Sequence, residues 1–348
     1  MSRINQAILV CLVSLIPVCA NAKKKHKMPK EKDLVAYLMV YHKDEDHGLH
    51  MAVSRDGYTF TALRGDKPIF AGDTIAEQRG IRDPYIFRSP DGGICVAMTD
   101  LHVFGQRAGR TTQWERDGDK YGWGNNRGLV LMKSFDLVNW TRANIDFTKI
   151  GPEFAETGCV WAPEMIYDEQ KKAIMLYYTT RIGNGPNTLS YVYVNDEFTA
   201  LTSVPQDLFH APNMAYNVID GDIVKVGDKY HLHYVSHEKG ATVKHAVSDH
   251  LTYGYVRDEN YNDGEKNSHE APNCWKRNGE EKWVVMYDVF GIRPANFGFT
   301  ETSDFVHYNP IGRFNEGVMK TTNFRSPKHG AVISITAKEA DFLLNYYK

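Results

Sequence analysis

IRDPYIF, at residues 81–87, sets an arginine and an aspartate against a proline and continues at once into an apolar run that favours a β-strand. Four other segments have the same order, with an ionisable or hydrogen-bonding side chain at the start of a short hydrophobic strand: residues 161–166, 218–224, 269–275 and 328–333. Most of them continue into a turn rich in Gly, Asp, Lys or Asn and then into further strand-forming runs. The chain therefore contains a repeat.

Self-similarity at a period of several tens of residues, with about four strands in each unit, is typical of a β-propeller. In that architecture the first strand of every blade lies nearest the axis, so the residues at its entrance converge on one central depression. Three carboxyl side chains that are far apart in sequence, Asp83, Asp220 and Glu270, are therefore expected to face one another across a single pocket.

The two ends of the chain are expected to meet in one blade. Ordered structure begins at Leu34, and residues 35–60 supply strands that resemble the second, third and fourth of a blade, with no first strand before them. Residues 330–335 form a lone strand that would complete this unit, and such closure removes exposed sheet edges. The sequence thus predicts an all-β fold, a five-bladed β-propeller closed by the C-terminal strand, in one domain at residues 34–348.

The other four blades begin at Ile81, Val160, Val218 and Glu270, and no linker marks a second domain. The first of these blades carries a polar insertion, residues 104–126, which is rich in Gly and Arg and contains two tryptophans. Long loops in compact domains are often functional, so the insertion is a candidate wall of the pocket. A solvated excursion with no role in the pocket is the alternative.

The N-terminal residues indicate targeting and not part of the fold. Residues 1–22 combine a basic start, an apolar core and a small-residue cleavage site, which is the pattern of a secretory signal peptide. Residues 23–33 form a charged leader. Lipid attachment at Cys19 is an alternative, although the residues before it are not the small ones that such a site needs. We expect an exported protein, periplasmic or secreted, with no membrane span because no other long apolar run appears.

Composition argues against a nucleic-acid partner and against stabilisation by disulfide bonds. The chain has 348 residues and a formal net charge of -2, which is too balanced for a nucleic-acid footprint. Cleavage after residue 22 leaves Cys95, Cys159 and Cys274, an odd and sparse set that makes no disulfide framework. Stability is therefore expected from a packed core, and we expect a monomer that binds a carbohydrate.

Three carboxylates around one depression suit the hydrolysis of a glycosidic bond. One carboxyl must be protonated to assist the leaving oxygen, one must be ionised to activate water, and a third can tune the acid through its charge. A reaction that inverts the sugar needs its two working carboxyls roughly 6.5 to 9.5 Å apart, so that water fits between them. Opposite walls of a propeller pocket can supply this gap.

Five motifs in order resemble those of family 43 glycoside hydrolases, over residues 34 to 344: Arg82-Asp83-Pro84, Trp161-Ala162-Pro163-Glu164, Ile219-Asp220, Glu270-Ala271-Pro272 and His329-Gly330-Ala331-Val332-Ile333. Members of that family are five-bladed propellers that invert configuration at the sugar. The resemblance implies that Asp83 is the general base, Glu270 the general acid and Asp220 the residue that raises the pKa of the acid and orients it. It also implies a calcium ion near the axis, with His329 as its neighbour or ligand.

In one respect the sequence departs from the common family pattern. Many members carry the base motif in the first blade, near the start of the chain, whereas here Arg82-Asp83-Pro84 follows a full set of strands. Closure of the ring through the C-terminal strand would explain this offset, because the first complete blade then begins at Ile81.

Each candidate residue also has a structural interpretation. An aspartate before proline, such as Asp83, is often a turn former, and either Asp220 or Asp222 could cap a turn around the glycine between them. Glu164 competes for a catalytic role, although in the resembling family this position supports the fold. Further candidates are substrate-binding side chains that could equally serve packing or solvation: Trp161, Arg82, Arg325 and Lys328. Three histidines within strand patterns are expected to be strand residues and not metal ligands: His231, His233 and His245.

Other functions fit parts of the pattern. Fructan and sucrose hydrolases share Arg-Asp-Pro but need an early Asn-Asp-Pro, which the sequence lacks. A propeller glycoside phosphorylase would need a basic phosphate site beside the acid, and a non-catalytic carbohydrate-binding propeller would tolerate loss of the carboxylates. The prediction is an inverting glycoside hydrolase that releases arabinofuranosyl, xylosyl or galactosyl units, and the sequence leaves the choice of sugar open.

Overall fold

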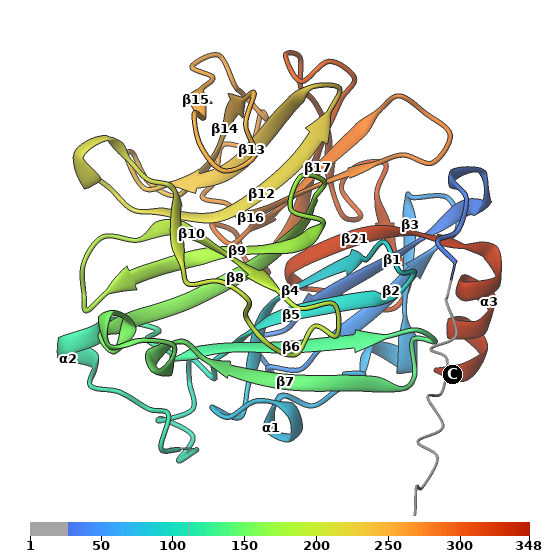
Figure 1. Cartoon of the computed structure of the whole chain (residues 1–348). Coiled ribbons are helices and arrows are strands. Elements are labelled where there is room, and N and C mark those ends of the chain that lie inside the picture. The colour runs from blue at the N-terminus through green and yellow to red at the C-terminus, as the bar shows by residue number, and fades with distance from the viewer. Residues whose placement is uncertain (1–26, 111) are drawn as a thin grey trace, which may run out of the picture.

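The structure is a computed structural model of the chain that describes residues 27–110 and 112–348. Within them, five antiparallel-based sheets are arranged in a ring around a central axis (Figure 1). The expected signal peptide and Cys19 lie outside the described residues, as do the first four residues of the expected leader. The rest of that leader precedes strand β1, which begins at Leu34 as predicted.

One blade joins the two ends of the chain. Its strands, from the axis outward, are β21 (Lys328–Thr336), β1 (Leu34–His42), β2 (His50–Ser54), β3 (Thr59–Ala62) and the short β20 (Lys320–Thr321). Strand β1 pairs with β21 along its length, from Leu34 opposite Thr336 to His42 opposite Lys328. The predicted closure by the C-terminal strand is therefore confirmed.

The other four blades are four-stranded, and each follows the chain from the axis outward in order. Their strands are β4 (Ile81–Arg88), β5 (Ile94–Asp100), β6 (Gly128–Ser134), β7 (Trp140–Asp146); β8 (Thr157–Asp168), β9 (Ala173–Ile182), β10 (Thr188–Val194), β11 (Gln206–Phe209); β12 (Val218–Val226), β13 (Lys229–Ser236), β14 (Thr242–Ser248), β15 (Val256–Arg257); and β16 (Glu270–Lys276), β17 (Trp283–Val289), β18 (Asn296–Thr302), β19 (Asn309–Arg313). The innermost strands β21, β4, β8, β12 and β16 contact one another in that cyclic order. The fold is a five-bladed β-propeller.

Apolar side chains fill the gaps between neighbouring blades. Five buried clusters account for the core, and each joins two adjacent blades. Leu131 of β6 and Leu176 of β9, for example, share the cluster between the second and third blades. Burial of one such leucine contributes roughly 1.5–3 kcal/mol, so interblade packing is the main source of stability. His233 and His245 are fully buried in the fourth blade, consistent with strand residues.

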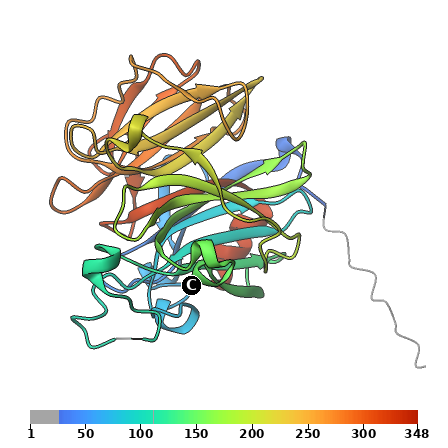
Figure 2. The same cartoon turned by 60° about the vertical axis from the view of Figure 1, so that its left-hand side comes forward.

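The helices are few and lie outside the ring. The longest, α3 (Ala337–Tyr346), was not predicted, and it packs Ala340 and Leu343 on the closing blade. The shorter ones are η1 (Glu31–Asp33), η2 (Leu63–Asp66), α1 (Gly72–Ile75), α2 (Gly118–Tyr121), η3 (Phe147–Lys149), η4 (Pro152–Phe154) and η5 (Pro212–Met214). The segment that contains α2 belongs to the predicted insertion, and it stands out beside the sheets in both views (Figures 1 and 2).

Two further expectations can be compared with the described residues. Cys95, Cys159 and Cys274 are all free thiols, so no disulfide joins the blades. None of the helices in the described ranges is long and apolar enough to cross a membrane.

Candidate active site

Each innermost strand is interrupted by a bulge at the same position. The residues at the five bulges all have left-handed backbone angles although none is glycine: Asp83 (φ 49°), Ala162 (φ 43°), Asp220 (φ 50°), Ala271 (φ 52°) and His329 (φ 32°). The pairing register with the second strand shifts at the same points. Such a conformation costs roughly 1–3 kcal/mol for a non-glycine residue and is typical of functional sites. The bulge explains the proline or glycine that follows each of these residues in the sequence.

Hydrogen bonds from the second strand of the preceding blade hold the bulges. The backbone N–H of Asp83 donates to Nδ1 of His42 on β1 over 3.1 Å. The N–H of Ala162 donates to Oγ1 of Thr99 on β5 over 2.9 Å, and the N–H of Asp220 donates to Oγ1 of Thr179 on β9 over 2.9 Å. The positions of Asp83 and Asp220 are therefore set by the preceding blades as well as by the blades to which they belong.

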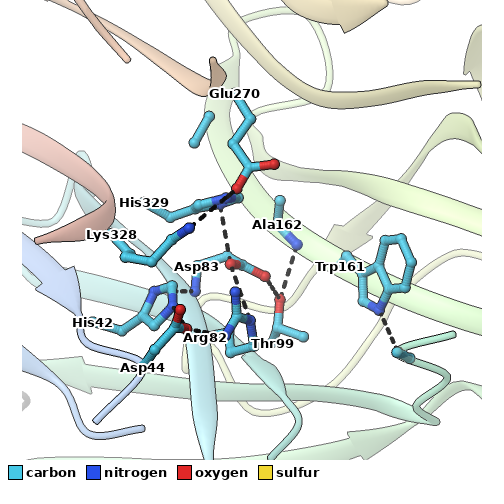
Figure 3. Close-up of polar contacts among 12 residues, drawn as sticks. His42, Asp44, Arg82, Asp83, Thr99, Trp161, Ala162, Glu270, Lys328 and His329 are labelled. Atoms are coloured by element: carbon cyan, nitrogen blue, oxygen red, sulfur yellow. Dashed lines mark hydrogen bonds and ion pairs between the residues drawn. The ribbon is translucent and has the colours of Figure 1, made fainter. Parts of the chain in front are cut away.

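Asp83 and Glu270 lie on two sides of the imidazole of His329 (Figure 3), and Asp220 approaches the same ring. Nδ1 of His329 lies 3.0 Å from Oδ1 of Asp83, and Nε2 lies 2.9 Å from Oε1 of Glu270. Nε2 is also 3.9 Å from Oδ2 of Asp220. Asp83 and Glu270 thus bind opposite nitrogens of one imidazole ring.

Two cations border this group on the side of the closing blade. Nη1 of Arg82 binds Oδ1 of Asp44 over 2.6 Å, and its Nε lies 4.0 Å from Oδ1 of Asp83. Nζ of Lys328 lies 3.2 Å from Oδ2 of Asp288 and 3.6 Å from Oε1 of Glu270. The site therefore balances buried carboxylates with fixed positive charges.

The surrounding charges keep Asp83 ionised. Burial alone would raise the pKa of this carboxyl, but the imidazolium of His329 and the guanidinium of Arg82 outweigh it and lower the pKa to about 2. For His329 the balance is reversed. Burial disfavours its charge, yet Asp83, Glu270 and Asp220 together raise its pKa to about 10. An ionised Asp83 suits the general base that the resemblance implies.

The pKa values of the other two carboxyls are shifted in opposite directions. Burial and the charges of Glu270 and Asp83 raise the pKa of Asp220 to about 7, although His329 opposes them. Burial would also raise the pKa of Glu270, but His329, Lys328 and Arg82 lower it to about 2. The carboxyl of Asp220 is therefore protonated more readily than that of Glu270. Delivery of a proton by Glu270 therefore requires substrate to break its ion pair with His329.

Glu164, the competing carboxyl, lies in a second buried layer behind the bulges. Its Oε2 accepts a hydrogen bond from the hydroxyl of Tyr177 over 3.3 Å, and Oδ2 of Asp222 accepts the backbone N–H of Cys274. Burial and the charge of Asp222 raise the pKa of Glu164 well above its usual range. Both side chains are satisfied inside the fold, which agrees with a structural role for Glu164.

A cavity of about 580 Å³ opens from Glu270 over the third and fourth blades. Trp123 and Trp161 form one wall, with ring centroids 6.0 Å apart. Nε1 of Trp161 donates to the carbonyl of Gly124, and Arg181 stacks on the face of Trp161 while donating to the carbonyls of Tyr121 and Trp123. The predicted insertion therefore does form a wall of the pocket. The opposite wall includes Tyr216, Ile219 and His237.

Most of the predicted site residues come together. Arg82, Lys328 and Trp161 border the carboxyl group as expected, whereas Arg325 is exposed and makes no hydrogen bond or ion pair to any described residue. Sequence reasoning missed His42, Thr99 and Asp288. Their signal is positional: each stands on a second strand, opposite or beside the bulge of an innermost strand.

The same cluster contains the ligand atoms for a possible cation. Asp220, Glu270 and His329 each offer one atom, and these atoms lie within 4.8 Å of one another. The adjoining axial chamber of about 20 Å³ has room for about one water molecule. Two carboxylate oxygens suit calcium, which takes six to eight oxygen ligands, so water would have to complete the shell.

The chain is similar to known glycosyl hydrolases in sequence. The model of the glycosyl hydrolase 43-related family, described as a probable glycosyl hydrolase domain, matches residues 32–341. An alpha-L-arabinofuranosidase of Bifidobacterium longum is 26% identical over 219 residues, which are 57% of this chain but only 18% of that protein. The chain therefore spans about a fifth of the length of that relative.

Solved structures show the same fold at low identity. An endo-1,4-beta-xylanase from Bacteroides thetaiotaomicron has a TM-score of 0.57 at 11% identity, with 82% of this chain and 93% of that chain covered. An exo-1,5-alpha-L-arabinanase from a bovine ruminal metagenomic library has a TM-score of 0.52 at 15% identity, with 81% and 94% covered.

Proposed function

Because the chain belongs to the glycosyl hydrolase 43-related family, we propose that its axial pocket hydrolyses glycosidic bonds with inversion at the sugar. The observation that carries the proposal is the meeting of Asp83, Asp220 and Glu270 at the axis, with Asp83 and Glu270 on opposite sides of His329. The substrate is an arabinofuranosyl, xylosyl or galactosyl polysaccharide or oligosaccharide. The arabinofuranosidase that matches part of the chain makes an arabinofuranoside the first substrate to test.

Each carboxyl has a proposed role. Asp83 activates the attacking water, Glu270 protonates the leaving oxygen, and Asp220 stabilises the protonated form of Glu270 and orients it. Asp83 is ready as a base because its charge is already stabilised by Arg82 and His329. Glu270 borders the cavity of about 580 Å³. The leaving part of the substrate therefore lies in this cavity.

Hydrolysis of aryl glycosides by the native protein, Glu270→Gln and Asp83→Asn tests these roles. We expect activity on one sugar, a loss of roughly 10²–10⁴-fold in each variant, and a product of inverted anomeric configuration by NMR. Glu259→Gln, which changes an exposed glutamate, is the matched control and should keep full activity. Activity that survives both site substitutions would refute the assignment and direct attention to Glu164.

A phosphorylase is the second candidate, since Arg82 and Lys328 lie beside the acid. Both cations are already paired, Arg82 with Asp44 and Lys328 with Asp288, which favours water over phosphate as the nucleophile. Turnover in phosphate-free buffer, without a sugar phosphate product when phosphate is added, would support hydrolysis. Dependence of the rate on phosphate would support the phosphorylase.

The pocket also suggests where the enzyme cuts. Trp123 and Trp161 wall the cavity on one side, so we propose release of units from chain ends. Product analysis on a linear polysaccharide should show mono- or disaccharides from the first minutes. A ladder of intermediate lengths would contradict this proposal.

Calcium remains a proposal supported by the carboxylate oxygens of Asp220 and Glu270, and His329 would join them as a ligand only after losing the proton that its raised pKa retains. When bound, the ion would supply positive charge that stabilises the carboxylates of the site. Calcium that is added back after divalent ions have been removed with a chelator should raise both the melting temperature and the activity. Export also remains a proposal, because residues 1–22 on which it rests lie outside the described residues.

A further inference from the structure

A second cavity, of about 590 Å³, opens on the face of the propeller opposite the candidate active site. It lies between the third and fourth blades, where Asp168 ends strand β8. Trp161, on the same strand, borders the catalytic cavity. The two cavities are roughly 20 Å apart along this strand, at a rise of about 3.3 Å per residue. They are therefore separate sites.

Five aromatic side chains are among the fifteen residues that line this far cavity. Four tyrosines and a histidine contribute to it: Tyr191, Tyr193, Tyr230, Tyr253 and His250. Tyr191 and Tyr193 meet edge to face at 5.9 Å, and His250 stacks on Tyr253 with ring centroids 4.2 Å apart and planes 16° from parallel. Tyr253 is 59% exposed. A stacked pair with one exposed face offers a platform for an apolar, flat surface of a ligand.

The polar groups of the cavity are held in place by the fold. The hydroxyl of Tyr193 donates to Oδ2 of Asp168, and that of Tyr191 donates to Oε1 of Gln206, each over 2.6 Å. Oδ1 of the buried Asp168 accepts the backbone N–H groups of Gln170 and Lys171. These contacts fix the two tyrosine rings, so the cavity is pre-organised and not formed on binding.

The lining also limits the chemistry of the ligand. It carries two carboxylates, Asp168 and Asp249, and one ammonium group, Lys171, and Asp249 is paired with Lys229, so the lining offers no cluster of cations to bind phosphate. The remaining polar side chains are neutral amides and hydroxyls: Gln170, Gln206, Thr202, Ser203 and Thr252. Neutral donors and acceptors beside aromatic faces match a ligand with many hydroxyls on one side and C–H groups on the other. A sugar ring has both.

We propose that the far cavity is a second saccharide-binding site, which takes another segment of the neutral polysaccharide that the axial pocket cleaves. The identity of that polysaccharide rests on the proposed function, whereas saccharide binding at this site does not. Its volume is within the range of pockets for small ligands, roughly 300–1,000 Å³, and suits one or two sugar units. Binding here would keep the enzyme on a polymer between cleavage events and would leave short substrates unaffected.

Gel electrophoresis through soluble arabinan, arabinoxylan, xylan or galactan tests the proposal. The proteins carry Glu270→Gln so that the polymer stays intact, and they are compared with and without Tyr253→Ala and His250→Ala. The matched control is Tyr346→Ala in α3, where a tyrosine that is 55% exposed stacks on Phe342. We expect retardation by at least one polysaccharide, weakened about tenfold in apparent affinity by Tyr253→Ala and not by Tyr346→Ala. In the active protein, Tyr253→Ala should slow hydrolysis of the polymer and leave hydrolysis of an aryl glycoside within twofold.

Each outcome decides the proposal separately from the catalytic assignment. A protein that cleaves no glycoside but loses retardation through Tyr253→Ala would refute the proposed hydrolase and support the far site. Retardation unchanged by Tyr253→Ala and His250→Ala would overturn the far site, even in an active enzyme. Equal losses in Tyr253→Ala and Tyr346→Ala, or no retardation by any of the four polymers, would overturn it as well.

Discussion

Asp83 and Asp220 combine two unfavourable features, a left-handed backbone and a buried carboxyl group. Both are tolerated because neighbouring residues supply compensation at short range. Thr99 shows this most directly: its hydroxyl donates to Oδ2 of Asp83 over 2.7 Å and accepts the N–H of Ala162 over 2.9 Å. One side chain thus orients the proposed base and joins two blades.

Replacement of Thr99 by valine tests this double role, since the two side chains have nearly the same shape. We expect a loss of about 1–3 kcal/mol in the free energy of unfolding, because a buried N–H and a carboxylate lose their partner. The activity should fall roughly tenfold as Asp83 becomes less well oriented. Urea denaturation and kcat/KM measure the two effects, with the exposed Thr322→Val as control. Unchanged activity in a destabilised variant would limit Thr99 to a structural role.

The pair of Lys328 and Asp288 is the second residue-level test. Asp288 is fully buried, so Lys328→Met leaves an unpaired carboxyl and should cost roughly 3–5 kcal/mol of stability. Adding Asp288→Asn removes that charge and should restore most of the stability lost in Lys328→Met. Thermal unfolding of the single and double variants provides the measurement. If the double variant is no more stable than Lys328→Met, the unpaired charge is not the cause.

At the scale of elements, the ends of the chain support each other through β21, β1 and α3. Helix α3 begins with a capping box, in which Thr336 and Glu339 bind each other's backbone N–H groups. Glu339 also forms two hydrogen bonds of 3.0 Å with Arg88 at the end of β4. The helix therefore fastens the closing blade to the next one.

Two substitutions at Glu339 separate these contributions. Glu339→Ala removes the ion pair and the half of the capping box that the Glu339 side chain supplies, and we expect a loss of about 1–2 kcal/mol in stability. Glu339→Gln keeps an oxygen for the cap and removes the charge, so it should cost about half as much. Differential scanning calorimetry measures both. Equal losses in the two variants would mean that the cap contributes nothing.

At the scale of the whole molecule, the two faces of the ring differ in the side chains that they carry. One face has the strained bulges and fixed charges around the axis, and the other has an aromatic cavity between blades. Loops between the blades hold this arrangement. Glu265, in the segment that leads to the fifth blade, forms an ion pair of 3.0 Å with Arg313 on its outermost strand.

The stability of the molecule should depend on pH through this pair. Burial would raise the pKa of Glu265, but hydrogen bonds from Arg313 and Asn267 outweigh it and lower the pKa to about 2. The unfolded chain therefore binds the proton first on acidification. Ionised Glu265 therefore contributes about 2 kcal/mol to the free energy of unfolding. This contribution is complete above the pKa of the unfolded chain, near 4.5, and is lost as the pH falls toward 2. The difference in unfolding free energy between native protein and Glu265→Gln should shrink over that range. A difference that stays constant from pH 6 to pH 2.5 would contradict the assignment.

The sequence by itself determined the strands, the five-fold repeat and the place of Asp83, Asp220 and Glu270 at strand entrances. These features depend on alternating apolar residues and on turn-forming Pro, Gly and Asp, which act over a few residues. Helix α3 was not predicted, although its Thr336 and Glu339 have the spacing of a capping box, because a helix of ten residues is stabilised mainly by packing, here of Ala340 and Leu343 on the closing blade.

Only the tertiary structure decided how the site is charged and what surrounds it. His329 and Glu270 are 59 residues apart, and the contact between the innermost strands β16 and β21 of two neighbouring blades brings them within 2.9 Å. The raised pKa of Asp220, the support of Asp83 by His42 and Thr99, and the far cavity all depend on side chains from different blades. Burial and Coulomb interactions act through space, so their balance at each carboxyl follows from the closed ring and not from neighbours along the chain.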